Sequence, residues 1–337
     1  MASLAYDTAV VKISVIIPVR NEEQSIGPLL ECLINQTLKP AEIVITDGGS
    51  TDATCDIISG FVERGFPVRL IREAAALPGR GRNLAAAQAT NEWIAFIDAG
   101  ITPEANWLEL LARRAQLADD INGVDVVYGS YEPVADTFFK RCAVMAYVAP
   151  PVETEGKWVR SRSVVSLLMK RSVWQTVGGF PEDLRSAEDL LFMKKIEQGN
   201  FRIANAPEAL VHWQVQPTPW LTFKRFVTYS RNNLQAGLWR QWQAAIFKRY
   251  LLITISALPV IVFGFRWLLF TLLLWLLMLA VRALVAIWRN RLCAPGTIVT
   301  NAARLLMLVP IIALLDAATI IGTLQWVLTA KAPRPPS

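Results

Sequence analysis

The stretch ISVIIPVRNEE, residues 13–23, is apolar and rich in β-branched side chains up to Val19, and then turns polar within one residue. Comparable apolar runs recur at residues 42–47, 67–73, 92–99 and 123–131. Segments of helical length lie between the runs, at residues 21–35, 51–62, 80–90 and 103–117. This alternation is typical of a parallel sheet flanked by helices, in which ligands bind beyond the carboxyl ends of the strands. The sequence therefore predicts an α/β fold.

The C-terminal part of the chain is almost continuously apolar over residues 250–265, 267–281 and 305–328, and Asp316 is the one charged residue inside these runs. A helix needs about 20 residues to cross a bilayer. With flanking residues included, we predict three transmembrane helices. We expect a soluble domain of residues 1–242, spans at residues 247–265, 267–288 and 304–328, and a Pro-rich tail of residues 329–337.

The basic residues around these runs predict how the chain is oriented. Lys248, Arg249, Arg291 and Arg304 fall on the same side of the expected spans, and nothing in residues 1–7 resembles an export signal. We therefore expect a multi-pass protein of the cell membrane whose soluble domain lies in the cytosol. The net charge of +6 includes no long positive run, which argues against nucleic acid as a partner.

A basic amphipathic helix is expected just before the first span, at about residues 219–240. Its apolar residues Trp220, Phe223 and Val227 recur at helical spacing, with Lys224 and Arg231 on other faces. This pattern is typical of a helix that lies on a membrane surface. A helix packed on the soluble core is the alternative.

Polar clusters follow three of the expected strands: PVRNEE after the first, TDGGSTD after the second and DAG after the fourth. In this order and spacing they resemble the family 2 glycosyltransferases, which have the GT-A fold, a Rossmann-like architecture. Members transfer a sugar from a nucleotide-sugar donor with inversion at the anomeric carbon. The resemblance extends over about residues 12–213 and implies a membrane-anchored enzyme of this family.

The first cluster has two interpretations. Asn21 and Glu22 commonly cap a following helix. The resemblance implies instead that they belong to the donor site, with Glu22 against the nucleoside and with Pro18 and Val19 lining the base.

In the second cluster, Ser50 and Asp52 are candidates for capping the next helix. Capping does not explain Asp47 before two glycines, which let a backbone turn sharply and approach a ligand. The resemblance implies that Asp47 contacts the base, where a carboxylate accepts from the imide N–H of uracil. A UDP-sugar is therefore the expected donor.

The segment LPGRGRN places Arg82 and Asn83 before an alanine-rich helix. Gly79 and Gly81 alone suggest a dinucleotide fingerprint, but its third glycine is missing and the loop does not follow the first strand. The resemblance assigns Arg82 and Asn83 to the neighbourhood of the donor's phosphates, where a guanidinium group matches phosphate oxygens.

The fourth strand ends in Asp98, where the family has a D-x-D motif that binds a divalent cation on the donor diphosphate. Gly100 replaces the second aspartate here. One carboxylate suffices for Mg²⁺ or Mn²⁺ when phosphate and water fill the remaining positions. The single histidine, His212, is a candidate for the missing ligand; a strand histidine bonded to a neighbour is the alternative.

Glu188 and Asp189 match the family's E-D motif, whose aspartate deprotonates the acceptor hydroxyl; Gly178-Gly179-Phe180 precedes them as in the family. Inverting transfer needs one such base. The alternative is a capping box that begins at Ser186. A second acidic pair, at residues 182–183, lies in the preceding loop and ranks lower.

Together these features predict transfer of a sugar to a lipid or lipid-linked acceptor. The Q-x-x-R-W motif of processive synthases is missing from LQAGLWRQWQ, so a single transfer is favoured over polymerisation. Three alternatives stay open: a soluble acceptor, a catalytically weak scaffold protein, and a transporter-like protein in which Asp316 has a role.

Overall fold

The computed structural model describes residues 11–117, 123–154 and 157–330. The chain divides into an α/β unit, residues 1–132 and 155–213, and a helical unit, residues 133–154 and 214–337. The expected boundary at residue 242 therefore differs from the observed one. Residues 214–242 belong with the apolar helices instead of with the sheet.

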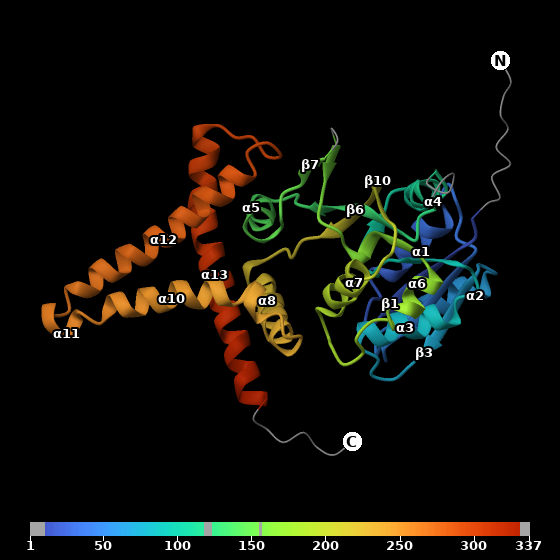
Figure 1. Ribbon diagram of the computed structural model, residues 1–337, viewed down its shortest axis with the longest axis horizontal. Coiled ribbons are helices and arrows are strands. Elements are labelled where there is room, and N and C mark those ends of the chain that lie inside the picture. The colour runs from blue at the N-terminus through green and yellow to red at the C-terminus, as the bar shows by residue number, and fades with distance from the viewer. Residues whose placement is uncertain (1–10, 118–122, 155–156, 331–337) are drawn as a thin grey trace. The chain divides into compact units, whose positions relative to one another are not determined.

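Figure 1 shows the α/β unit with several of its strands labelled. The unit is built on an eight-stranded sheet with the order β3-β2-β1-β4-β9-β6-β10-β5. Its first four strands in space are parallel, as predicted. Strand β9 lies between β4 and β6 and is antiparallel to both, so β6 runs in the same direction as β4, as predicted, but is separated from it by a strand that comes later in the chain. The strands are β1 (Ile13–Val19), β2 (Glu42–Asp47), β3 (Val68–Arg72), β4 (Trp93–Phe96), β5 (Ile101–Pro103), β6 (Val126–Val134), β9 (Leu167–Lys170) and β10 (Ile203–Gln214).

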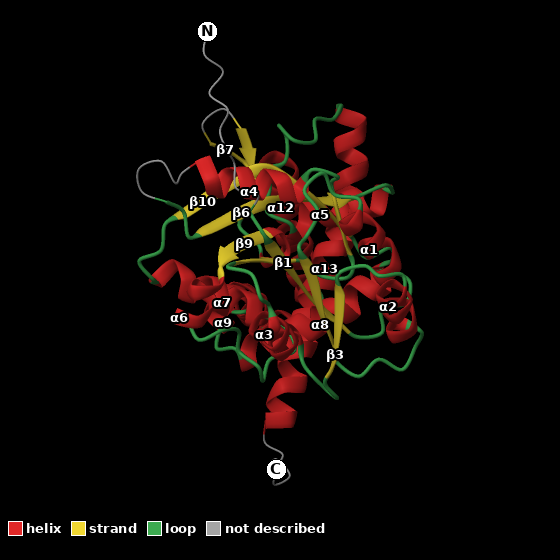
Figure 2. Cartoon of the chain, turned by 90° about the vertical axis from the view of Figure 1, so that its right-hand side faces the viewer, coloured by secondary structure: helices red, strands yellow, loops and turns green. Residues whose placement is uncertain are grey.

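Helices cover both faces of this sheet (Figure 2). Successive side chains of a strand point to opposite faces, so Ile13, Val15 and Ile17 enter one core while Ile16 enters the other. The first core is completed by α1 (Ile26–Ile34), α2 (Thr54–Glu63) and α4 (Trp107–Leu117). The second is completed by α3 (Pro78–Gln88), α6 (Arg171–Thr176) and α7 (Glu188–Gln198).

Three helices begin later than expected: α1, α2, which begins at Thr54, and α4. Helix α1 begins at Ile26, because Asn21 has a left-handed backbone with φ 56° that no helix continues. Helix α4 begins at Trp107 because residues 101–103 form the short strand β5.

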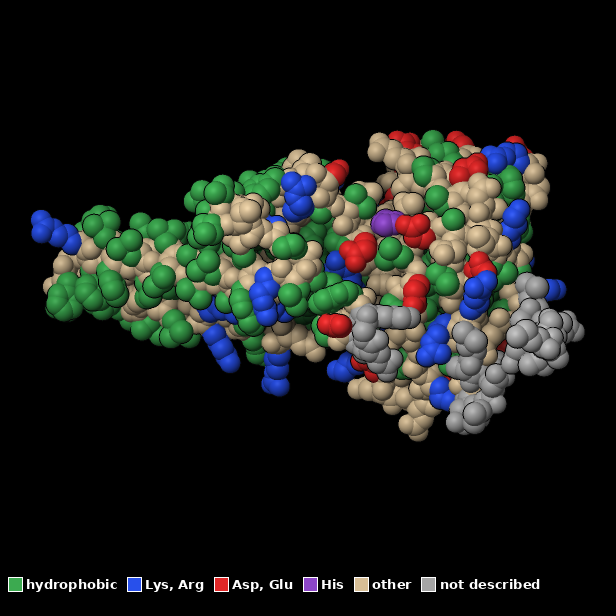
Figure 3. Space-filling view, turned by 90° about the horizontal axis from the view of Figure 1, so that it is seen from above, with side chains coloured by type: hydrophobic (Ala, Val, Ile, Leu, Met, Phe, Trp, Pro, Cys, Tyr) green, Lys and Arg blue, Asp and Glu red, His purple; other side chains and the backbone are tan. Residues whose placement is uncertain are grey.

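The helical unit contains three helices that are long and apolar enough to cross a membrane, over Ala244–Phe263, Trp267–Arg289 and Ile298–Thr329. Their apolar side chains dominate the surface over these helices in Figure 3. The predicted turn between the first two is correct, with Gly264 at φ 72°. The elements of this unit are α5 (Phe138–Tyr147), β7 (Val152–Thr154), α8 (Pro219–Gln235), α9 (Trp239–Trp242), α10 (Ala244–Ala257), α11 (Val260–Phe263), α12 (Trp267–Arg289) and α13 (Ile298–Ala330). The other elements of the described residues are β8 (Lys157–Val159) and the 3₁₀ turn η1 (Val164–Ser166).

The expected amphipathic helix is α8, and it packs along α13. The Ser230 hydroxyl donates to the Thr319 carbonyl at 2.8 Å, and a Cβ added at Gly322 would lie 2.4 Å from the Val227 carbonyl oxygen. The backbones therefore approach closely, as small residues permit. One face of α8 is thus occupied by an apolar helix of the same unit. The helix ends at Gln235, earlier than expected, and Gly237 follows with φ 74°.

Asp316, the one carboxylate inside the apolar runs, has charged and polar partners. Asp316 of α13 is fully buried and forms a two-armed ion pair with Arg282 of α12, with one N···O distance of 2.9 Å. The Tyr250 hydroxyl of α10 also donates to Asp316, at 3.2 Å. A paired charge of this kind gives no support to a transport role.

Candidate active site

The loops that follow β1 and β2 are bonded to each other. The Asn21 side-chain oxygen accepts from the Thr51 N–H at 2.8 Å, and the Asn21 N–H donates to the Ser50 hydroxyl at 2.8 Å. The N-cap residues of α1 and α2 are Ser25 and Ala53, so the capping interpretations of Asn21 and Ser50 are wrong. These residues instead hold two strand-end loops in one fixed arrangement.

Glu22 joins the same arrangement from β1. Its N–H donates to the Thr54 hydroxyl at 2.7 Å, and its carboxylate accepts from the Ser25 hydroxyl. Pro18 and Val19 end the strand just before it, with Val19 only 5% exposed.

Asp47 is 4% exposed and stabilises the glycine loop after β2. Its carboxylate accepts from the N–H groups of Gly49 and Ser50, at 3.1 Å each. Gly49 has φ 85°, and a Cβ added at Gly48 would lie 2.5 Å from the Ala76 carbonyl oxygen, so both positions require glycine. A carboxylate has about four acceptor positions, which leaves Asp47 able to accept from a ligand as well.

Arg82 lies at the centre of the charged site. Its Nη2 donates to Asp98 at 2.6 Å and its Nη1 to Glu188 at 2.8 Å, while its side chain is only 5% exposed. Burial alone would lower the pKa of Arg82, but the two carboxylates outweigh it and raise that pKa. The guanidinium carbon lies 5.3 Å from the centre of the Phe180 ring. Arg82 therefore joins the end of β4 to the start of α7.

Glu188 and Asp189 form the first turn of α7. The N-cap is Ala187, with φ 72° and no side-chain cap, so the capping-box interpretation is wrong. Burial raises the pKa of both carboxyls, although the charge of Arg82 opposes the shift. Asp189 accepts from the Leu190 N–H at 2.8 Å. A carboxylate with a raised pKa in this position is suited to accept a proton.

Asn83, the neighbour of Arg82, is committed to the loop before α7. Its side-chain oxygen accepts from the Phe180 N–H at 2.9 Å and from the Trp174 indole N–H at 3.1 Å. Its amide nitrogen donates to the Phe180 carbonyl and to Glu182, at 2.9 Å each. These bonds satisfy the hydrogen-bonding groups of the Asn83 amide within the protein. Asn83 therefore fixes the loop that carries Phe180, whose ring lies against the guanidinium of Arg82.

Each of the two candidate metal residues is bonded to another side chain. The His212 Nε2 lies 2.6 Å from Glu104, as the strand-histidine alternative predicts, while Asp98 pairs with Arg82 (Figure 3 shows the single purple histidine beside a red carboxylate). Among the described residues, no group of three or more His, Cys, Asp or Glu side chains is arranged to hold a metal ion. The Asp98 side chain is 36% exposed, so one accessible carboxylate fits a cation whose other ligands are phosphate and water.

Sequence reasoning missed the ion pair between Arg82 and Glu188 and the ring of Phe180 beneath the guanidinium. The available signal was the Gly-Gly-Phe turn at a fixed spacing before the acidic pair. Gly179 has φ 65°, and its added Cβ would lie 2.6 Å from the Asn83 side-chain oxygen. The turn therefore delivers Phe180 to the site.

Comparisons with known proteins find similar sequences and a similar fold. A model described as Glycosyl transferase family 2 matches residues 14–165. Glycosyltransferase AglE of Haloferax volcanii is 27% identical over 220 residues, which is 64% of this chain and 70% of that protein. The O-antigen chain rhamnosyltransferase RfbN of Salmonella typhimurium is 25% identical over 235 residues, again 64% of this chain and 70% of that protein.

A solved structure is similar over nearly the whole chain. The mannosyltransferase PcManGT from Pyrobaculum calidifontis, in complex with GDP-Man and Mn²⁺, has a TM-score of 0.55 and 19% sequence identity. The match covers 96% of this chain and 89% of that one. At this level of identity the likeness concerns the fold.

Proposed function

Since the chain belongs to the family 2 glycosyltransferases and is a transferase of GT-A fold, we propose that it moves a sugar, with inversion, from a nucleotide-sugar to a lipid or lipid-linked acceptor at the cytosolic membrane face. The observation that carries this proposal is the bridge through Arg82. It connects Asp98, at the end of a central strand, with the acidic pair at the start of α7.

The residues have complementary roles in this reaction. Pro18, Val19, Asn21, Glu22 and Asp47 surround the nucleoside, which we take to be uridine because Asp47 is able to accept from an imide N–H. Asp189 accepts the proton of the acceptor hydroxyl while the hydroxyl oxygen attacks the anomeric carbon of the donor sugar. The bond from that carbon to the diphosphate breaks at the same time. A divalent cation at Asp98 would supply positive charge to the departing diphosphate.

The lipid acceptor is inferred from the helical unit. Three helices apolar enough to span a bilayer anchor far more strongly than the two lipid-type signals that already give stable attachment. Helix α8 exposes Trp220 and Leu221 and carries Lys224, whose ammonium lies 5.0 Å from the Trp220 ring centre. Exposed tryptophan beside lysine is typical of a membrane interface. An acceptor confined to that membrane has a raised effective concentration at the enzyme.

The loss of the second aspartate at Gly100 is the observation that favours the competing scaffold hypothesis. The two hypotheses differ in whether the protein turns over a donor. Nucleotide release from a nucleotide-sugar, measured with and without added Mg²⁺ or Mn²⁺, separates them, because a scaffold releases none.

The decisive experiment uses the full-length protein in detergent or liposomes. Thermal stabilisation by a panel of UDP-, GDP- and dTDP-sugars identifies the donor; stabilisation by GDP-sugars alone contradicts a UDP donor. The radiolabelled donor is then incubated with a membrane extract, with Asp189→Asn as the inactive control. We expect label in the organic phase after solvent partition. Label only in water-soluble products would reject the lipid acceptor.

A further inference from the structure

Arg82 is not placed as a free phosphate ligand. Two of its nitrogens are already bonded to carboxylates, at 2.6 Å and 2.8 Å, and its side chain is 5% exposed. Its third nitrogen, Nε, is buried without a hydrogen-bond partner among the described residues, as is Oε2 of Glu188. Buried groups of this kind are rare in settled structural networks and occur where a further partner or a rearrangement completes the network.

Asp98 is correspondingly not placed as a free metal ligand. A cation that binds its carboxylate meets a guanidinium that already neutralises it. In the D-x-D motif a second carboxylate would also attract the cation, but Gly100 stands at that position here and contributes no negative charge. The competition for Asp98 is therefore between one arginine arm and one cation.

We propose that Arg82 is a positioning residue that competes with the divalent cation for Asp98. When the cation binds Asp98, the guanidinium nitrogen that was bonded to Asp98 binds the donor diphosphate instead. The other arm of Arg82 stays on Glu188, so arrival of the donor is coupled to the position of the acidic pair. This inference rests on the proposed function, since it assumes a diphosphate donor. It requires that the cation bind weakly when no nucleotide is present.

The site offers a test in each direction. Lysine at position 82 keeps the positive charge but has a single nitrogen without the two-armed fork, so Arg82→Lys weakens the hold on Asp98. Gly100→Asp adds the second carboxylate, and a Cβ there meets no atom within 4 Å. Arg80→Lys is the matched control, because Arg80 also pairs with two carboxylates, those of Glu73 and Glu182, but its side chain is 43% exposed.

The experiment measures binding of Mn²⁺ alone to the full-length protein, by electron paramagnetic resonance of free Mn²⁺, without nucleotide, sugar or acceptor. We expect Arg82→Lys to bind Mn²⁺ about fivefold more tightly than the native protein, the factor that corresponds to about 1 kcal/mol for a partly exposed ion pair. Arg80→Lys should leave binding unchanged. Binding that is unchanged or weaker in Arg82→Lys would overturn the proposal, because a purely structural or phosphate-binding arginine predicts no gain.

Gly100→Asp keeps the proposal testable if Arg82→Lys does not fold. It should tighten Mn²⁺ binding, and Asp98→Asn in the same chain should abolish the gain; a Gly100→Asp protein that binds no tighter than the native one overturns the proposal. Because no donor or acceptor is present, these results are independent of whether the acceptor is a lipid. A wrong acceptor assignment would instead show in the transfer experiment, as label in water-soluble products and not in the organic phase.

Discussion

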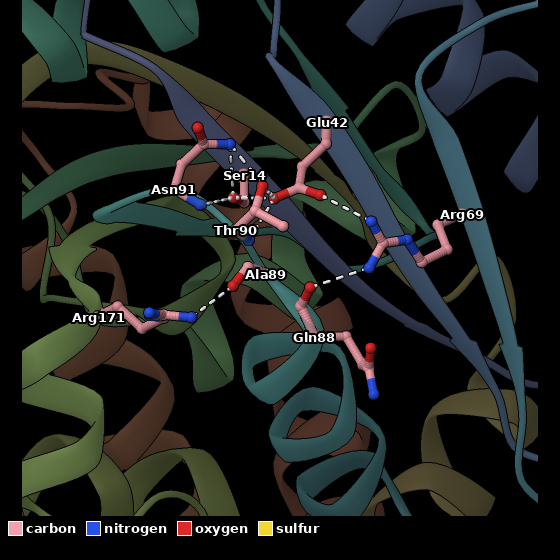
Figure 4. Close-up of polar contacts among 8 residues, drawn as sticks. All are labelled: Ser14, Glu42, Arg69, Gln88, Ala89, Thr90, Asn91 and Arg171. Carbon is pink, nitrogen blue, oxygen red and sulfur yellow. Dashed lines mark hydrogen bonds and ion pairs between the residues drawn. The ribbon is translucent and has the colours of Figure 1, made fainter.

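Two polar clusters lie at opposite ends of the same parallel strands, and they are built differently. At the amino end, Ser14, Thr90 and Asn91 all donate to Glu42 or to each other, and Arg69 approaches the second oxygen of Glu42 at 3.6 Å (Figure 4). None of the atoms of these five residues is among the buried ones without a partner in the described part of the chain.

At the carboxyl end, the cluster around Arg82 leaves two buried atoms without partners, and the pKa of Glu188 is raised by burial. At the amino end the hydrogen bonds from Thr90 and Ser14 outweigh burial and lower the pKa of Glu42. Satisfied polar networks stabilise a fold, whereas perturbed carboxyls gather at functional sites. We therefore infer that the cluster at the amino end of the strands stabilises the fold, whereas the cluster at the carboxyl end serves the function.

The largest effect is expected at Asp189. Asp189→Asn removes the base but not the donor contacts, so turnover should fall by about 10²-fold or more while the affinity for the nucleotide stays nearly constant. Steady-state transfer and nucleotide binding measure the two quantities. Asp183→Asn, in the loop before α7, is the control. Retention of more than about a tenth of the native turnover would show that Asp189 is not the base.

Asp98→Asn should weaken donor binding only when the cation is present, because the other partner of Asp98, Arg82, stays positively charged and can still meet the diphosphate. In Mg²⁺ or Mn²⁺, donor affinity should fall by about tenfold, a typical result of disturbing a metal site, whereas with the metal chelated the change should be small. Calorimetric titration with the nucleotide in both conditions gives the comparison. His212→Gln serves as the control, because His212 is bonded to Glu104. An equal loss in both conditions would mean that Asp98 acts without a cation.

Glu42→Gln should change stability and leave catalysis unchanged. The pKa of Glu42 is lowered in the folded protein, so its charge stabilises the fold above the unfolded pKa of about 4.3 and this contribution is lost as the pH falls through the folded pKa. Near pH 7 we expect a loss of about 2 kcal/mol, the scale of hydrogen bonds to a charged group. The difference in thermal unfolding between the two proteins should shrink as the pH falls through the lowered pKa of Glu42; a constant difference across pH would contradict this account.

The smallest effect should come from Arg69→Gln. Arg69 is 48% exposed, and its pair with Glu42 is long, so the free energy of unfolding should change by less than about 0.5 kcal/mol. The bond from its guanidinium to the Gln88 carbonyl, 3.0 Å, is the one direct hydrogen bond that its side chain is seen to make in the described chain. A denaturation series with both amino-end variants tests the ranking. If Arg69→Gln costs as much as Glu42→Gln, the ion pair and not the hydrogen bonds dominates this cluster.

The sequence predicts the parallel half of the sheet because β1 and β4 are nearly unbroken apolar runs between turns, and β2 and β3 each have an apolar centre, IVI and LI, in a short segment between turns. It does not predict β5, because three residues show no periodicity. The packing of α8 on α13 depends on small residues that the hydrophobic pattern does not register.

The candidate site was predictable as a set of strand-end residues but not as a network. Arg82 and Glu188 are 106 positions apart, and their pairing depends on where α3 and α7 lie against the sheet. The resemblance to the family pointed to each residue and implied that Arg82 lies near the donor phosphates. Only the tertiary arrangement relates Arg82 to two carboxylates, and His212 to Glu104.

The ion pair between Arg282 and Asp316 has a consequence for how the chain is made. In a bilayer, an unpaired charge near the centre of a helix costs about 2.5–3.5 kcal/mol during insertion, and α12 is synthesised before α13 brings the partner. The two helices should therefore leave the insertion machinery together. Asp316→Leu should leave Arg282 without its partner, and a pulse-chase experiment should then find the chain degraded faster. On this account, insertion of the three apolar helices would be complete only after α13 has been made.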